Sequence, residues 1–258
     1  MPFATLALTR RPPLAEVRLS RPERANPIDV RFLDELDETA ATLSDDADVR
    51  AVLLTAEGDV FSSGWDLSAV GEEAMRAARA HIGERLPFRC LELLPQPVIA
   101  CLEGNATGAG LELALACDVR IAAEGVTLAL PEVALGFLPS AGGTQRLPRI
   151  AGRGKALEMI LLGEPVDAAA ALGCGLVNAV VPREEVRGVA EKLAGAIASR
   201  GPLAVRYAKE AVLRGLDMPL EQALRYETDL TVILQTTADR AEGVRAFLDK
   251  RAPEFRGE

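Results

Sequence analysis

The sequence predicts an α/β fold with an all-helical C-terminal part. Three observations indicate this class. Up to residue 181, short apolar runs of strand length alternate with stretches of helical periodicity. Beyond Pro182, every long stretch has helical spacing. Hydrophobic residues make up 49% of the 258 residues, which is enough to build one large core.

The elements of the first part follow from periodicity and from turn residues. Segments 4–8 and 15–19 alternate between apolar and polar residues, and Arg11-Pro12-Pro13 marks a turn, so we expect two short strands. Segment 27–43 has helical spacing and predicts a helix. Further strands are expected at 49–55, 98–102, 119–122 and 177–181. Further helices are expected at 67–91, 111–116, 141–150, 155–162 and 168–172.

The C-terminal part is predicted to hold four long helices. Gly201-Pro202 separates the first two, and Pro219 stands near the start of the third. The predicted ranges are 184–199, 203–214, 220–236 and 237–250. We therefore expect an α/β core over residues 1–195 and a helical region over 196–258, which would cover the site or mediate assembly.

Charge and hydropathy limit the classes of partner. There are 38 acidic and 29 basic residues, and the net charge of −9 argues against general binding to nucleic acid or to an anionic membrane. Arg10 and Arg11 are followed by prolines rather than by the apolar stretch of a signal peptide. Since the chain also lacks an apolar run long enough to span a bilayer, we expect a soluble cytoplasmic protein.

Cysteine and histidine usage narrows the chemistry. The four cysteines form no Cys-x-x-Cys pair, so neither a metal site nor a redox motif is expected. The single histidine, His81, lies in a helical stretch, where a surface or packing role is the simpler interpretation. Catalysis by Ser-His-Asp or Cys-His groups requires a histidine base. If the protein is an enzyme, carboxylates and backbone dipoles are the better candidates.

Two glycine-containing loops are the strongest local signal. Residues 61–67 and 104–112 each follow an apolar run and each precede a predicted helix. Glycine permits backbone conformations closed to other residues and lets the backbone approach a ligand. Two N–H groups directed at one oxygen would form an oxyanion hole. Two acidic residues, Glu112 and Glu132, are placed where they could serve such a site.

These loops belong to an ordered series of motifs that resembles the crotonase superfamily, the enoyl-CoA hydratase/isomerase proteins. The resemblance covers nearly the whole chain. The series consists of Arg21-Pro22 with Asn26, the Gly64 and Gly108 loops, Ala116-Cys117-Asp118, Leu130-Pro131-Glu132, Gly142-Gly143-Thr144-Gln145-Arg146-Leu147, and Glu242-Gly243 through Phe247 to Lys250-Arg251. The resemblance implies a coiled β-β-α superhelix core, a helical C-terminal trimerisation region and an acyl-CoA ligand.

The resemblance also implies catalytic roles. The backbone N–H groups of Trp65 and Ala109 would form the oxyanion hole, although both residues depart from the commonest family residues. Glu112 and Glu132 match the two glutamates of hydratases, with Glu112 as water activator and Glu132 as proton donor to Cα. Each has a simpler interpretation, because Glu112 could favour a helix N-terminus and Glu132 could be a solvated loop residue. The ring of Trp65 could either shape the ligand site or pack on the following helix.

A wider set of residues is assigned to substrate or coenzyme A contact by the same resemblance: Arg24, Ser63, Gly64, Asp66, Leu67, Gly108, Ser140, Phe247 and Lys250. For Ser140 and Asp66 a helix-capping role is the favoured alternative. By the resemblance, Lys250 with Phe247 would reach the coenzyme across a subunit contact. Arg24 and Lys250 could instead be solvated charges. Asp118, Arg146 and Arg149 are expected to form structural ion pairs or caps.

The expected activity is that of an enoyl-CoA hydratase, the reversible syn addition of water to a 2-enoyl-CoA. A separate cofactor is not expected, because coenzyme A is part of the substrate. The alternatives are a carnitinyl-CoA dehydratase-like lyase, an isomerase that uses Glu132 alone, and a non-catalytic acyl-CoA-binding or RNA-binding relative. The resemblance also implies that residues 69–88 line the acyl pocket and that the protein forms a homotrimer or a dimer of trimers.

Overall fold

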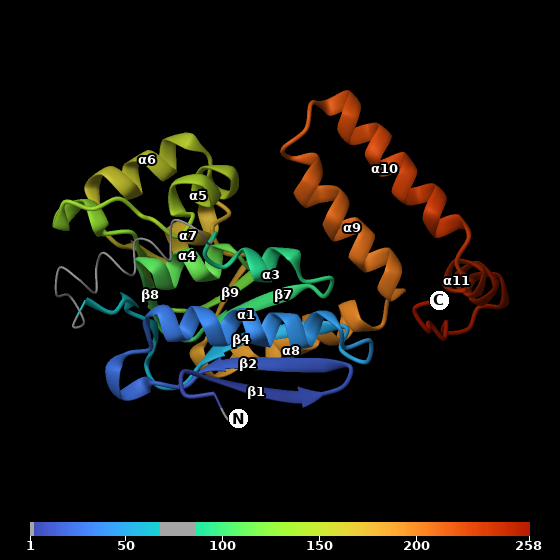
Figure 1. Ribbon diagram of the computed structural model, residues 1–258, viewed down its shortest axis with the longest axis horizontal. Coiled ribbons are helices and arrows are strands. Elements are labelled where there is room, and N and C mark those ends of the chain that lie inside the picture. The colour runs from blue at the N-terminus through green and yellow to red at the C-terminus, as the bar shows by residue number, and fades with distance from the viewer. Residues whose placement is uncertain (1–2, 68–85) are drawn as a thin grey trace.

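The computed structural model describes residues 3–67 and 86–258, and a six-stranded sheet forms its centre (Figure 1). The order of this sheet is β1-β2-β4-β7-β9-β12. Only β1 and β2 pair antiparallel; the other neighbours are parallel. The strands are β1 (Leu6–Arg11), β2 (Leu14–Leu19), β4 (Ala51–Ala56), β7 (Val98–Leu102), β9 (Val119–Ala123) and β12 (Ala179–Val181).

A second, smaller sheet positions the loops of interest. Its order is β11-β10-β8-β5, with β8 parallel to both β10 and β5. The strands are β5 (Val60–Ser62), β8 (Asn105–Thr107), β10 (Thr127–Ala129) and β11 (Val166–Asp167). The chain passes from β4 to β5, from β7 to β8 and from β9 to β10, so it moves from the large sheet to the small one three times. This repeated passage is the β-β-α superhelix that the resemblance implied.

The core lies between the large sheet and the helices that pack on it. Every residue of β4 and β7 is buried, as expected for parallel strands covered on both faces. Helix α8 (Val186–Ala198) packs against β4, β7 and β9 through alanines that leave room for a close approach. This helix crosses the predicted boundary at residue 195 and belongs with the sheet.

The helix expected at 27–43 begins later than predicted. Pro27–Ile28 forms the short strand β3, which pairs with β6 (Gly64–Trp65). Helix α1 spans Val30–Ser44, because the Asp29 side chain accepts the Phe32 N–H at 2.8 Å and so caps the helix there. The helical periodicity of the segment was correct, but its first residues serve the β3-β6 pair.

The other helices agree with the predicted ranges to within a few residues, with one exception. The helix expected at 67–91 lies mostly outside the described residues, as does His81; near its end the structure has α3 at Arg89–Leu93. The remaining helices of the core are α4 (Ala109–Leu115), α5 (Gly143–Ala151), α6 (Arg153–Leu162) and α7 (Ala168–Gly173).

The C-terminal helices project from the core. Helices α9 (Pro202–Gly215) and α10 (Leu220–Gln235) form an antiparallel hairpin, and α11 (Ala238–Asp249) follows α10 at the end opposite the hairpin turn (Figure 1). Lys209 of α9 docks this unit, because its Nζ donates to Asp118 Oδ2 at 2.7 Å and to two core carbonyls. Among the described residues, no helix is long and apolar enough to cross a membrane.

Candidate functional site

The turn between β8 and α4 brings bare backbone next to Glu132. Gly108 takes φ 55° and ψ −128°, a conformation that favours glycine. A Cβ atom at this position would lie 2.8 Å from Glu132 Oε1. Ala109 is the first residue of α4, so its N–H group has no acceptor within the helix and points out of its N-terminal end.

The β6 strand places a second N–H group beside the first. The Asp66 N–H donates to the Ile28 carbonyl at 2.8 Å. Because N–H groups alternate in direction along a strand, the Trp65 N–H points away from β3. A Cβ atom on Gly64 would lie 3.1 Å from the Ala109 nitrogen, so the two loops are in contact. This arrangement sets the amides of Trp65 and Ala109 in adjacent segments.

Glu112 lies one turn along α4 from Ala109, and its side chain is fully buried. Its Oε1 accepts the N–H groups of Ala141 at 2.8 Å and Gly143 at 2.7 Å. Its Oε2 is also buried and has no hydrogen-bond partner among the described residues. One oxygen is therefore fixed by the backbone, and the other is available to a ligand or a water molecule.

Glu132 reaches the same site from the small sheet. It begins the short helix η3 (Glu132–Leu135), just after β10, whose Ala129 is in register with Thr107 of β8. Parallel strands end at the same edge of a sheet, so Glu132 and Gly108 meet there. The side chain is nearly buried, and neither carboxylate oxygen has a hydrogen-bond partner within the described part of the chain.

Burial disfavours the charged form of both carboxyls and so raises their pKa values. It raises the pKa of Glu112 to about 7, an effect that the N–H groups of Gly143 and Ala141 oppose and the charge of Glu132 reinforces. Burial likewise raises the pKa of Glu132. A carboxyl whose pKa is close to the working pH can both accept and donate a proton, which is what general acid–base catalysis requires.

The residues near the first loop have mostly backbone or ion-pair roles. Arg24 pairs with Asp66 at 2.6 Å, so Asp66 is held by that guanidinium. Ser63 donates its N–H to the Ala25 carbonyl at 2.9 Å. The side chain of Leu67 is exposed. Whether any of these residues contacts coenzyme A stays a prediction.

The predicted cap at Ser140 is wrong. Helix α5 begins at Gly143, its N-cap residue is Gly142, and no side chain caps it. The Ala141 and Gly143 N–H groups instead bind the Glu112 carboxylate, so this loop is shaped around that side chain. The sequence did not predict that these two N–H groups bind Glu112. The Gly142-Gly143 pair was the one signal that the backbone comes close to another group there.

Three charged residues have the structural roles expected for them. Asp118 pairs with Lys209 at 2.7 Å and accepts the Val98 N–H. Arg146 pairs with Glu92 at 2.6 Å and also donates to the Ala141 carbonyl, which steadies the loop at Glu112. Arg149 approaches Asp217 at 3.5 Å.

Phe247 and Lys250 lie far from the two glutamates within one chain. Both belong to the α11 end of the molecule (Figure 1), and Phe247 is 82% exposed. Their predicted contact with coenzyme A was across a subunit boundary. Within a single chain these two residues are not part of the carboxylate site.

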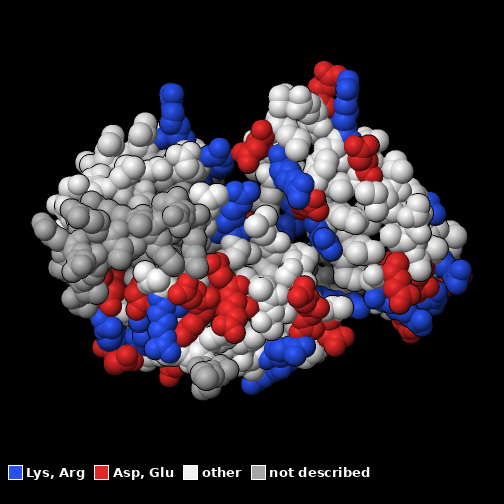
Figure 2. Space-filling view, viewed as in Figure 1, with Lys and Arg blue, Asp and Glu red and all other residues white. Residues whose placement is uncertain are grey.

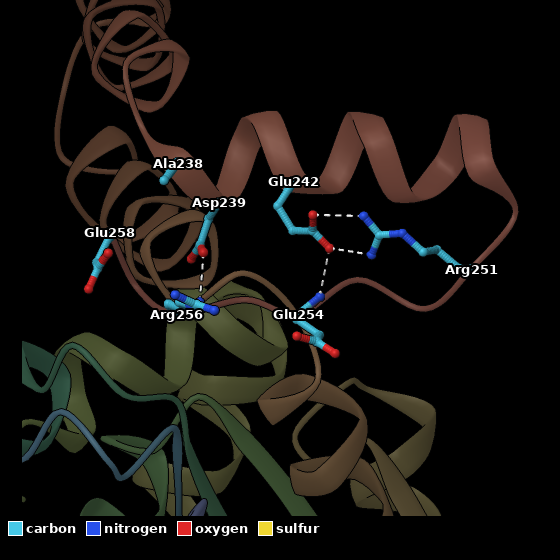
Figure 3. A pocket seen from close by; sticks show the side chains of 7 residues that line it. All are labelled: Ala238, Asp239, Glu242, Arg251, Glu254, Arg256 and Glu258. Carbon is cyan, nitrogen blue, oxygen red and sulfur yellow. Dashed lines mark hydrogen bonds and ion pairs between the residues drawn. The ribbon is translucent and has the colours of Figure 1, made fainter.

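A cavity of about 510 Å³ also lies at this end of the molecule, and neither Glu112 nor Glu132 lines it (Figure 3). Its charged residues bind one another: Glu242 accepts two bonds from Arg251, and Asp239 accepts the Arg256 N–H. These contacts fold the last residues back on α11. Among the described residues, no group of three His, Cys, Asp or Glu side chains could hold a metal ion.

Comparison with known proteins identifies the family of this chain. A crystal structure of an enoyl-CoA hydratase from Bacillus anthracis superimposes with a TM-score of 0.94 at 40% identity, covering 99% of this chain and 100% of that one. The crotonyl-CoA hydratase of Syntrophomonas wolfei is 36% identical over 99% of both chains. The short-chain-enoyl-CoA hydratase of Clostridium acetobutylicum is 36% identical over 97% of both. The model of the enoyl-CoA hydratase/isomerase family matches residues 10–258, and the chain therefore belongs to that family.

Proposed function

We propose that this protein is an enoyl-CoA hydratase, which adds water syn across the double bond of a 2-enoyl-CoA. The observation that carries the proposal is the pair of buried carboxylates, Glu112 and Glu132, with available oxygens beside two adjacent N–H groups. The hydratases among its relatives support the same activity.

The amides of Trp65 and Ala109 would bind the thioester oxygen. When water adds to Cβ, that oxygen gains negative charge on the way to an enolate. Preorganised N–H groups stabilise this charge more than that of the ground state, so they lower the barrier. Both donors are backbone groups, which explains why the unusual side chains at these two positions do not remove the site.

The two glutamates would divide the proton transfers. Glu112, ionised at the start, accepts a proton from the attacking water through Oε2, while Oε1 stays bound to the Ala141 and Gly143 amides. Glu132, protonated at the start, donates its proton to Cα. The water oxygen bonds to Cβ, the double bond supplies the electrons for the new C–H bond, and proton exchange with solvent restores both carboxyls.

The coenzyme and the assembly are further parts of the proposal. Figure 2 shows Lys and Arg side chains in the hollow between the α5–α6 side and the α9–α10 hairpin, despite the acidic net charge. Cationic side chains suit the phosphates of coenzyme A. We place Phe247 and Lys250 at the coenzyme of a neighbouring subunit in a homotrimer or a dimer of trimers.

The test is hydration of crotonyl-CoA, followed as loss of the enoyl-thioester absorbance, with Glu112→Gln and Glu132→Gln compared with the wild type. Removing one acid–base group should lower kcat by about 10²–10⁴-fold, because glutamine keeps the shape but carries no transferable proton. If either variant hydrates crotonyl-CoA as fast as the wild type, the two-carboxylate mechanism is contradicted.

A second substrate separates the hydratase from an isomerase. Isomerisation of a 3-enoyl-CoA moves one proton and needs one carboxylate. Activity on 3-enoyl-CoA that persists in Glu112→Gln and is lost in Glu132→Gln, with crotonyl-CoA inert, would identify an isomerase instead.

A further inference from the structure

Buried polar atoms without partners gather at the proposed site. In the described part of the chain, five buried side-chain atoms have neither a hydrogen-bond partner nor an ion pair. Four of these atoms belong to Glu112, Glu132 and Trp65. The glutamate oxygens are accounted for by the proposed reaction. The fourth atom, Nε1 of the Trp65 indole, has no role in it.

The Trp65 indole is an unusual place for an unpaired donor. Its ring is half-buried against the core, while Nε1 itself is hidden from solvent. The indole N–H can only donate, and in folded proteins buried tryptophan N–H groups usually find an acceptor. Leaving a buried donor unpaired costs free energy that any arriving acceptor would recover.

Trp65 also stands next to the proposed reacting group. Its own backbone N–H is one of the two amides proposed to hold the thioester oxygen, and a Cβ atom on the adjacent Gly64 would lie 3.1 Å from the nitrogen of the other amide, that of Ala109. A substrate held there would therefore place its pantetheine arm or its acyl chain within reach of the Trp65 side chain. The backbone and the ring of one residue would contact neighbouring parts of one ligand.

We propose that the Trp65 indole N–H is a substrate-binding donor that pairs with an acceptor oxygen of the bound acyl-CoA. The inference rests on the proposed function, because it requires an acyl-CoA in this site. The acceptor has two possible sources with the same chemistry. It is either an amide carbonyl of the pantetheine arm, common to all such substrates, or an oxygen carried by the acyl chain, which would make Trp65 a specificity determinant.

The chain contains a single tryptophan, so its indole N–H gives one resonance in a ¹H–¹⁵N spectrum and needs no assignment. A hydrogen bond deshields its proton and moves the resonance downfield. We expect the unliganded protein to show this resonance at an unbonded position and at least one bound acyl-CoA to move it downfield. A resonance already at a bonded position without ligand would overturn the proposal.

Four ligands distinguish the two sources, with binding measured in parallel by calorimetry. A downfield shift with free coenzyme A and butyryl-CoA assigns the acceptor to the pantetheine arm. A shift only with acetoacetyl-CoA or adipyl-CoA assigns it to the acyl chain. Calorimetric binding without any shift refutes the indole contact but leaves the proposed function intact. Absence of binding by all four ligands refutes both.

A variant gives an independent readout. Trp65→Phe keeps an aromatic ring and the backbone N–H but removes the indole donor. Loss of one neutral hydrogen bond should weaken binding of the shifting ligand by about three- to tenfold. Unchanged affinity in a variant with native circular dichroism would count against the contact.

Discussion

At the scale of single residues, the site depends on how Glu112 is buried. A carboxylate removed from water strongly favours its neutral form, and two backbone N–H groups on Oε1 restore part of the stability of the charged form. The balance leaves the pKa near 7 rather than far above it. The hydrogen bonds thus keep a buried glutamate usable as a base at neutral pH.

This balance has a measurable effect on stability. Because the folded-state pKa of Glu112 is about 7 against an ordinary value of 4.5, the folded chain keeps a proton that the unfolded chain loses between these values. The contribution of Glu112 therefore makes the wild type less stable as pH rises through this window, by up to about 3 kcal/mol.

The Glu112→Gln variant should not lose stability in this way, because glutamine does not ionise. Its free energy of unfolding relative to the wild type should increase from pH 4.5 to pH 7 and then level off, as measured by denaturant titration across this range. Glu221→Gln, at an exposed position of α10, should change stability by less than about 0.5 kcal/mol. A difference between Glu112→Gln and wild type that did not change with pH would contradict the burial argument.

At the scale of elements, two turns hold the site together. The β8–α4 turn at Gly108 presents the Ala109 amide, and the loop before α5 presents the amides that bind Glu112. The far end of α4 is also fixed, because the buried guanidinium of Arg120 donates to the carbonyls of Ala114 and Cys117. Helix α4 is therefore held at both ends, which limits how far Ala109 and Glu112 can move.

Gly108→Ala tests the first turn. The new Cβ atom would lie 2.8 Å from Glu132 Oε1, so Glu132 must move, and we expect a loss of kcat of about 10²-fold or more because small displacements of acid–base groups are costly. Steady-state kinetics with crotonyl-CoA measures this loss of kcat.

The matched control is Gly125→Ala. Gly125 also has a positive φ, 78°, but a Cβ there meets nothing within 4 Å. Both variants should lose about 1 kcal/mol or more of stability through backbone strain, yet only Gly108→Ala should lose activity. Equal activity in the two variants would show that contact with Glu132 does not matter.

The sequence predicted the long elements better than the short ones. The runs at β4 and β7 were visible because fully buried parallel strands are almost continuously apolar. Strands β3, β5, β8 and β10 have two or three residues, which is too short for a period to be recognised. The glutamates and glycine loops were predicted, whereas the Ala141 and Gly143 amides were not, because any residue supplies an N–H group.

At the scale of the whole molecule, the C-terminal helices expose more apolar surface than a free chain would be expected to carry. Leu220 is 75% exposed and Phe247 is 82% exposed. The other large exposed apolar residues of this region are Val212, Leu213, Leu216, Leu224, Val232, Ile233, Val244 and Leu248. Extensive apolar surface of this kind marks an interface, and it supports the proposed assembly.

Sedimentation equilibrium tests the assembly. We expect a mass three or six times 27.4 kDa, and a shift toward 27.4 kDa when Leu216 and Leu220 are both changed to Glu, because buried charge opposes association. Glu221→Gln on the same hairpin should keep the assembled mass. A wild-type mass of 27.4 kDa would rule out the trimer, and with it the contribution of Phe247 and Lys250 from a neighbouring subunit.

In the proposed reaction, two amides and two carboxylates converge on one thioester. A crystal structure with bound acetoacetyl-CoA tests it most directly. We expect the thioester oxygen at about 2.7–3.1 Å from both the Trp65 and the Ala109 nitrogens, with the Glu112 and Glu132 carboxylates on the same side of the acyl chain at Cα and Cβ. A thioester oxygen bound away from these amides, or an acyl chain remote from either glutamate, would contradict it.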